Sequence, residues 1–142
     1  SFLDCDAYDI EGTSLRILGC TLWSNVSDEA RDKVGSCLND YASIFVARSD
    51  GSKSKATVDD TNSWHQRELA WLQSEIQRAE DDGKRVIVLT HHAPTFHCTS
   101  APQHRSEPPF FINYAFATGL EYMLKAPVLA WLFGHSHWSS WQ

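Results

Sequence analysis

The sequence predicts an α/β fold in which helices alternate with parallel strands, at least in the second half of the chain. Two short apolar segments, 85–90 (RVIVLT) and 128–133 (VLAWLF), are typical of buried strands, and each follows a helical segment. That order of helix, strand, helix, strand favours parallel packing. The length of 142 residues corresponds to about one domain, and 42% hydrophobic with 21% charged residues is typical of a globular protein with a real core.

The first half of the chain holds one predicted strand and one predicted helix. Residues 14–23 (SLRILGCTLW) are mostly apolar and end on an aromatic residue, which indicates a strand. In the polar segment SDEARDK that follows, Ser27 is suited to cap a helix and the acids after it suit a first turn. Residues 48–60 (RSDGSKSKATVDD) have the composition of a loop.

The clearest predicted helix covers residues 61–82. Its apolar side chains recur at spacings of three and four, the pattern of an amphipathic helix: Leu69, Leu72, Ile76 and Ala79. Gly83 is a typical residue to follow such a helix. His65 precedes this apolar stripe by four residues and is predicted to be a packed core histidine. Residues 112–125 (INYAFATGLEYMLK) are predicted as a further helix despite Gly119.

Charge, cysteine spacing and hydropathy narrow the class of partner. The net charge of −6 comes from scattered acids and speaks against a nucleic acid or an anionic membrane, but a bound metal would still allow a phosphorylated substrate. The four cysteines lack the paired spacing of a zinc ribbon, which leaves free thiols or one disulfide as alternatives. No apolar run reaches membrane-spanning length. Localisation stays open between the cytoplasm, slightly favoured, and secretion if a leader lies upstream.

Four of the seven histidines directly follow predicted strands. His91 and His92 come after the first strand of the second half, and His135 and His137 come after the second. Because the carboxyl ends of parallel strands meet at one edge of a sheet, we expect His91, His135 and His137 to converge there. Neutral imidazole is a common ligand of zinc, manganese and iron. Gly134 would let the backbone turn sharply ahead of the ligands.

A bare His-x-His pair is a weak signal, since many histidines that follow strands are structural. A Thr-His-x-x-Pro segment together with a Gly-His-x-His segment is more specific. VIVLTHHAP (86–94) and WLFGHSH (131–137) resemble the last two metal motifs of the calcineurin-like metallophosphoesterases, the superfamily that includes purple acid phosphatases and phosphodiesterases. HQRELAWLQSEI (65–76) and LRILGCTLW (15–23) also resemble segments of that superfamily.

The resemblance implies a phosphoester hydrolase with two divalent metal ions, which would be manganese, zinc or iron, and with a metal-bridged hydroxide as nucleophile. By the same resemblance His91 and His135 bind one ion and His137 binds the other. His92 is expected either to contact the phosphorylated substrate or to cap the turn. The implied fold is a four-layer α-β-β-α sandwich.

Three earlier motifs of the superfamily do not occur in this sequence: Asp-x-His, Gly-Asp and Gly-Asn-His. In the superfamily they supply the carboxylate that bridges the metals, an amide ligand and the histidine near the leaving group. We therefore expect residues 1–142 to be the C-terminal portion of a single catalytic domain that lacks its N-terminal half. Such a chain should be inactive alone, because neutral imidazoles cannot bridge two cations that repel each other.

Two other classes of function stay open. The chain could be a non-catalytic metal-binding or interaction module with the same fold. It could also be a metal-independent α/β domain whose histidines are structural. The sequence immediately upstream of Ser1 would separate the enzyme from both, since the three missing motifs belong there.

Overall fold

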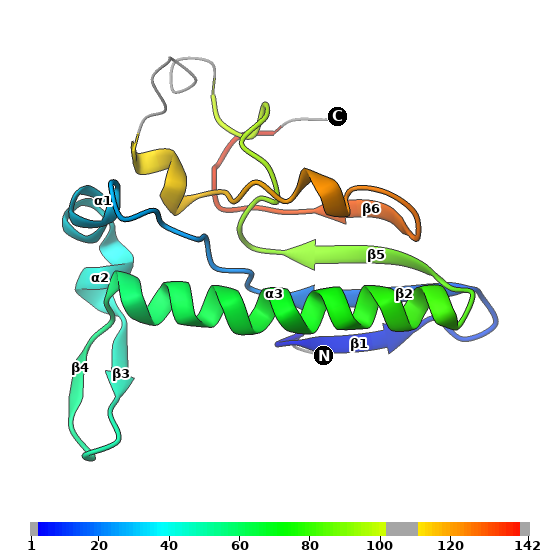
Figure 1. Cartoon of the computed structure of the whole chain (residues 1–142), viewed down its shortest axis with the longest axis horizontal. Helices are drawn as coiled ribbons and strands as arrows, with labels where there is room; N and C mark the ends of the chain where they lie inside the picture. Colours follow the sequence, from blue (N-terminus) through cyan, green and yellow to red (C-terminus); the bar gives the residue numbers. More distant parts are fainter. Residues whose placement is uncertain (1–2, 102–110, 140–142) are drawn as a thin grey trace.

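The structure is a computed structural model that describes residues 3–101 and 111–139, and it confirms the α/β class. The main sheet has four strands in the order β1-β2-β5-β6. Their bounds are Asp6–Asp9 for β1, Leu15–Cys20 for β2, Arg85–Thr90 for β5 and Val128–Leu132 for β6. β1 is antiparallel to β2, whereas β2, β5 and β6 are parallel, so the sheet is mixed. Figure 1 shows the arrowheads of the three parallel strands at the same end of the sheet.

The long helix α3, Val58–Asp81, packs against β2 and β5 (Figure 1). Its first turn is closed by a capping box, in which Thr57 Oγ1 accepts a hydrogen bond from Asp60 N and the Asp60 carboxylate accepts one from Thr57 N at 2.8 Å. The helix predicted at 61–82 is confirmed and starts three residues earlier than expected. None of the helices in the described ranges combines the length and the apolar character needed to cross a bilayer.

The main hydrophobic core lies between α3 and one face of the sheet. Leu72 and Ala79 of the helix pack with Leu18 of β2 and with Val86 and Val88 of β5, and all five side chains are fully buried. Burial of a leucine or valine side chain contributes about 1.5–3 kcal/mol to stability. These contacts fix β2 and β5 beneath the helix and thereby set the positions of their carboxyl ends.

A smaller second core lies beside the start of α3. It joins α1 (Arg31–Cys37), α2 (Asn39–Ser43) and β3 (Phe45–Ala47) to the first turns of α3 and to Ala115. β3 pairs with β4 (Lys53–Lys55) in a hairpin, and Ala56, directly after β4, belongs to the same core. Val34 of α1 is its fully buried centre. This cluster stands at the carboxyl-end side of the parallel strands (Figure 1).

Two predictions for the first half need correction. The helix predicted after Ser27 begins only at Arg31, because Ala30 occupies the N-cap without a side-chain hydrogen bond, and Ser27 instead accepts a backbone bond from Ala30. The segment 48–60, predicted as a loop, contains β4 and the first turn of α3. The strand was not predicted because its side chains are all exposed and the segment therefore has the polar composition of a loop.

The helix predicted at 112–125 is wrong. The chain forms two short 3₁₀ turns instead, Phe111–Ala115 and Glu121–Met123. Between them Ala117 pairs with Ala93 in an isolated parallel bridge, and Thr118 N donates to Ala93 O at 3.0 Å. These backbone bonds to the segment after β5 replace the bonds that a continuous helix would make, so a tertiary contact overrides the local preference.

Candidate metal centre

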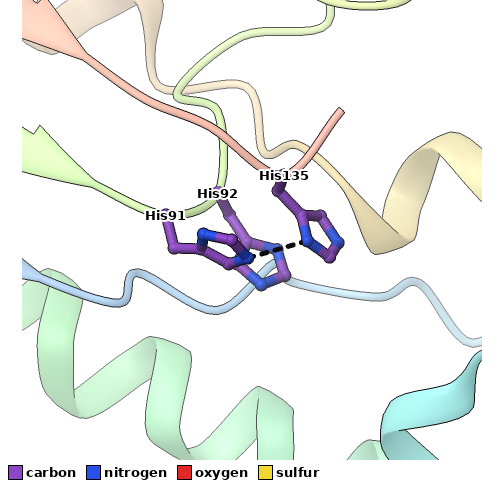
Figure 2. A group of neighbouring side chains, drawn as sticks. All are labelled: His91, His92 and His135. Carbon is purple, nitrogen blue, oxygen red and sulfur yellow. Dashed lines mark hydrogen bonds between the residues drawn. The ribbon is translucent and has the colours of Figure 1, made fainter. Parts of the chain in front are cut away.

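Three imidazoles converge at the carboxyl edge of the parallel strands (Figure 2). His91 and His92 directly follow β5, and His135 follows β6 after Phe133 and Gly134. One ring nitrogen from each of the three lies within 4.8 Å of the others, an arrangement that could hold a metal ion. The predicted convergence is confirmed for His91 and His135.

The backbone around the group ties the ends of β2, β5 and β6 together. Thr21 O, directly after β2, accepts hydrogen bonds from His91 N at 3.1 Å and from His92 N at 3.2 Å. On the other side, Gly134 N donates to His91 O at 3.0 Å. The expected sharp turn falls on His135, which has a φ of 63°, and not on Gly134. A non-glycine residue in this left-handed region is uncommon and marks a position that the surrounding structure enforces.

The three rings contact one another directly. His135 Nδ1 lies 3.0 Å from His91 Nε2, and the His92 and His135 rings are stacked with centroids 4.2 Å apart. Between two ring nitrogens at that distance one donates and the other accepts, so the accepting nitrogen carries a lone pair that this hydrogen bond occupies and that a metal would have to take over. Neutral imidazole with a free lone pair is the form that binds a metal.

His92 is the buried member of the group, with only 3% of its surface exposed. Its Nδ1 lies 2.8 Å from Ser24 Oγ, and the Trp23 ring packs against it with centroids 5.2 Å apart. Burial, aided by the neighbouring His135 and His91, lowers the pKa of the His92 imidazole to about 2. His92 is therefore neutral at ordinary pH, and its ring is held in place by the bond between Nδ1 and Ser24 Oγ.

His135 carries the clearest sign of an unfilled bonding position. Its Nε2 is buried and, within the described residues, has no hydrogen-bond partner. Burial and the neighbouring His91 lower the pKa of this imidazole, so the ring stays neutral. A buried polar atom without a partner is costly and calls for an explanation. A metal ion bonded to Nε2 would satisfy it, so the donor set fits an N-ligated cation.

Two buried side chains of α3 brace the segment beneath the histidines. His65 Nδ1 is hydrogen-bonded to Trp23 O, and Glu68 Oε2 accepts from Trp23 N at 3.2 Å. Both side chains are 2% exposed, and burial lowers the pKa of His65 and raises that of Glu68. The core position predicted for His65 is confirmed. Glu68 was not predicted; its spacing of three from His65 was the available signal.

His137 does not belong to the three-histidine group. It is exposed, and its φ of 51° repeats the left-handed conformation of His135. His97 is exposed as well, and His104 lies outside the described residues. The group itself contains no carboxylate among the residues that the structure describes. The three-histidine group thus contains His91 and His135 of the predicted ligands together with His92, and His137 is not among its members.

Comparison with known proteins adds one relative. "Uncharacterized protein L509" of Acanthamoeba polyphaga mimivirus is 32% identical over 139 residues, which cover 95% of this chain and 47% of the viral protein. The chain thus spans about half the length of the curated relative that it matches. No protein-family model matches the chain, and no solved structure matches it. The name of the viral protein states no function, so any activity must be argued from the site.

Proposed function

We propose that this chain provides histidine ligands of a metal-dependent phosphoester hydrolase of the calcineurin-like metallophosphoesterase type. The observation that carries the proposal is the convergence of His91, His92 and His135 at the carboxyl edge of three parallel strands, with His135 Nε2 buried and unpaired. The carboxyl edge of a parallel sheet is where ligands of α/β proteins bind. The motifs Thr90-His91-His92-Ala93-Pro94 and Gly134-His135-Ser136-His137 supply the link to this superfamily.

We assign His91 and His135 to the first metal ion, since their rings touch and come from adjacent strands. His92 reaches the same point, and its low exposure favours a ligand role over the substrate contact suggested by its sequence position. His137 is kept as the proposed ligand of a second ion. Imidazole ligands suit manganese, zinc or iron.

Within this proposal the chain's own residues bind and orient the cations. Ser24 fixes the His92 ring through Nδ1, and the backbone bonds of Thr21 fix the positions of His91 and His92. When bound, a pair of divalent ions supplies an activated water and neutralises the charge on the phosphoryl oxygens. Ligands held by buried hydrogen-bond partners keep their geometry, which raises metal affinity about 10- to 100-fold.

The four-layer sandwich is also a proposal, and the free face of the sheet supports it. α3 covers the face that carries Leu18 and Val88. On the opposite face Leu129 is 55% and Leu132 is 54% exposed, and Ile87 is only half-buried. Parallel sheets are normally covered on both faces. We propose that the remainder of the catalytic domain, in line with the greater length of the viral relative, packs on this face as the other two layers.

A second candidate function is a metal-binding or interaction module without catalysis. The observation in its favour is the lack of a carboxylate in the three-histidine group among the described residues. Two cations about 3.5–4 Å apart need an anionic bridge, which imidazoles cannot provide. One cation, in contrast, can be held by three neutral imidazoles.

Titration calorimetry of the metal-stripped chain with zinc or manganese tests whether the group binds metal. We expect His135→Ala to weaken binding by at least about tenfold, because loss of a direct ligand should exceed the effect of losing its hydrogen-bond partner. His97→Ala is the matched control, since His97 is exposed and outside the group, and it should bind like the original chain. Equal affinities of the two variants would instead indicate adventitious binding to surface histidines.

A further inference from the structure

Cys5 and Cys20 each lie one residue beyond the last pair of the β1–β2 ladder, Asp6 with Gly19. The antiparallel register pairs Asp9 with Arg16 and ends with Asp6 opposite Gly19, and continuing it by one position would bring Cys5 opposite Cys20. Cys5 itself has a left-handed φ of 54° and precedes the strand proper. The chain nevertheless stays beside β2 there.

The evidence for that continued contact is the close approach of Leu3 to β2. A Cβ atom placed on Gly19 would lie 2.5 Å from Leu3 Cβ, so the Leu3 side chain occupies the space over that glycine. A continued ladder would bring Leu3 opposite Leu22, so its place over Gly19 shows that the chain turns at Cys5 and stays close to the end of β2.

The two thiols point toward the same core. Cys20 is 5% exposed and lies on the face that carries Leu18 and α3, and the half-buried Cys5 packs against this same cluster. Burial raises the pKa of Cys20 to about 12, and the Cys5 thiol contributes to that rise. Burial followed by the charge of Glu68 raises the pKa of Cys5. Both thiols therefore border the same buried cluster beside α3.

We propose that Cys5 and Cys20 are a redox site that closes to a reversible disulfide when the chain meets an oxidised small-molecule disulfide such as oxidised glutathione. Opposed residues of an antiparallel pair have Cα atoms about 4.5 or 5.5 Å apart. Both separations fall within the range of about 4.4–6.8 Å that disulfides span. This inference is independent of the proposed hydrolase function.

The chemistry is thiol–disulfide exchange in two steps. Cys5, the more exposed thiol, loses its proton and attacks one sulfur of oxidised glutathione, which forms a mixed disulfide and releases one reduced glutathione. Cys20 then loses its proton and attacks the Cys5 sulfur, which releases the second reduced glutathione. The two cysteines are oxidised and one glutathione disulfide is reduced. The raised thiol pKa values make the reaction slow at neutral pH and faster at alkaline pH.

The bond would act on an exposed strand next to the candidate metal centre. All four residues of β1 are exposed, so this edge strand has little burial to hold it in place. A bond from Cys5 to Cys20 would tether it covalently. Cys20 directly precedes Thr21, whose carbonyl oxygen accepts from both His91 N and His92 N, so the tether would also stiffen the support of the histidines.

Peptide mapping after oxidation tests the pairing, because trypsin places the four cysteines on four separate peptides: 1–16, 17–31, 34–48 and 86–105. The folded chain is incubated with oxidised and reduced glutathione in several ratios at pH 8, blocked with alkylating agent and digested without reductant. We expect peptides 1–16 and 17–31 to be joined and to be lighter by two hydrogen atoms than their sum. Cys5→Ser and Cys20→Ser should each abolish this joined species, and Cys37→Ser should retain it.

Thermal melting provides a second readout. Oxidation should raise the melting temperature of the original chain by several degrees and leave that of Cys5→Ser unchanged, since a native disulfide restricts the unfolded chain. The proposal would be overturned if Cys5 and Cys20 remained alkylated as free thiols, or each carried glutathione, at a ratio where the exposed Cys37 is fully modified. Joined peptides in other combinations at equal yield would overturn it as well.

Discussion

The 142-residue chain is expected to show no metal-dependent hydrolysis of an aryl phosphate monoester or diester, whereas a longer polypeptide that adds the three upstream motifs is expected to gain it. The physical reason is the composition of the site. The group of His91, His92 and His135 offers imidazole nitrogen donors and no bridging anion among the described residues. A second cation beside the first would then be repelled, and activation of a water molecule by paired ions would be lost.

Within the longer polypeptide, His137→Ala is expected to lower turnover by more than about 100-fold, because it removes a proposed direct ligand of the second ion. His97→Ala, which alters an exposed histidine outside the group, should leave turnover unchanged. Rates are measured with added manganese and with chelator. Chelator-sensitive turnover by the 142-residue chain would contradict the claim that hydrolysis needs the upstream motifs and their bridging carboxylate. If the longer polypeptide hydrolysed neither the monoester nor the diester, the result would favour the non-catalytic metal-binding or interaction module.

The second large effect concerns the dependence of folding stability on pH. In the metal-free chain, the free energy of unfolding should fall as pH drops below about 6.5. The His92 imidazole has a pKa of about 2 when folded, against 6.5 for the ordinary group. Below pH 6.5 the His92 imidazole therefore binds a proton in the unfolded state but not in the folded state, which favours unfolding. His92 alone should account for a loss of about 1.4 kcal/mol per pH unit, or about 2 kcal/mol at pH 5.

Other buried groups add to the pH profile and must be separated from His92. His65 and His135 also have a lowered pKa and act in the same direction. Glu68 acts in the opposite direction, because its raised pKa lets the folded state keep a proton that the unfolded state loses above about pH 4.5. A comparison of variants cancels these contributions.

Urea denaturation at pH 7, 6 and 5 in the presence of chelator gives the required slopes. In the His92→Gln variant, the slope of the free energy of unfolding against pH should be smaller by the contribution of about one proton. The slope of His97→Gln should equal that of the original chain. If His92→Gln kept the full slope, the burial of His92 as a neutral ring would be contradicted.

The strands that carry the site could be predicted because their apolar runs are continuous. In β5, Val86 and Val88 are buried against the helix, and in β6, Val128 and Trp131 pack against the same core, so both strands are rich in apolar residues. β1 could not be predicted in the same way. Its residues, Asp-Ala-Tyr-Asp, are all exposed, and the backbone ladder to β2 together with the ion pairs of Asp9 with Arg16 and Lys84 holds them in place.

The membership of the histidine group was predictable only in part. Strand direction alone brings His91 and His135 to the same edge. Extended backbone would place neighbours on opposite sides and would keep His135 and His137 on the same side. Instead the backbone amides of His91 and His92 both bond to Thr21 O, and left-handed φ angles at His135 and His137 interrupt the alternation. These tertiary bonds and turns bring His92 into the group and leave His137 outside it.

X-ray absorption of the zinc-loaded chain is the most direct measurement of the central claim, which is that His91, His92 and His135 hold a metal ion together. The account predicts three imidazole nitrogen ligands at about 2.0–2.1 Å from zinc, and two in the His135→Ala variant. The spectrum of His97→Ala should match that of the original chain. A zinc shell made only of water and carboxylate oxygen atoms, or one unchanged by His135→Ala, would contradict the account.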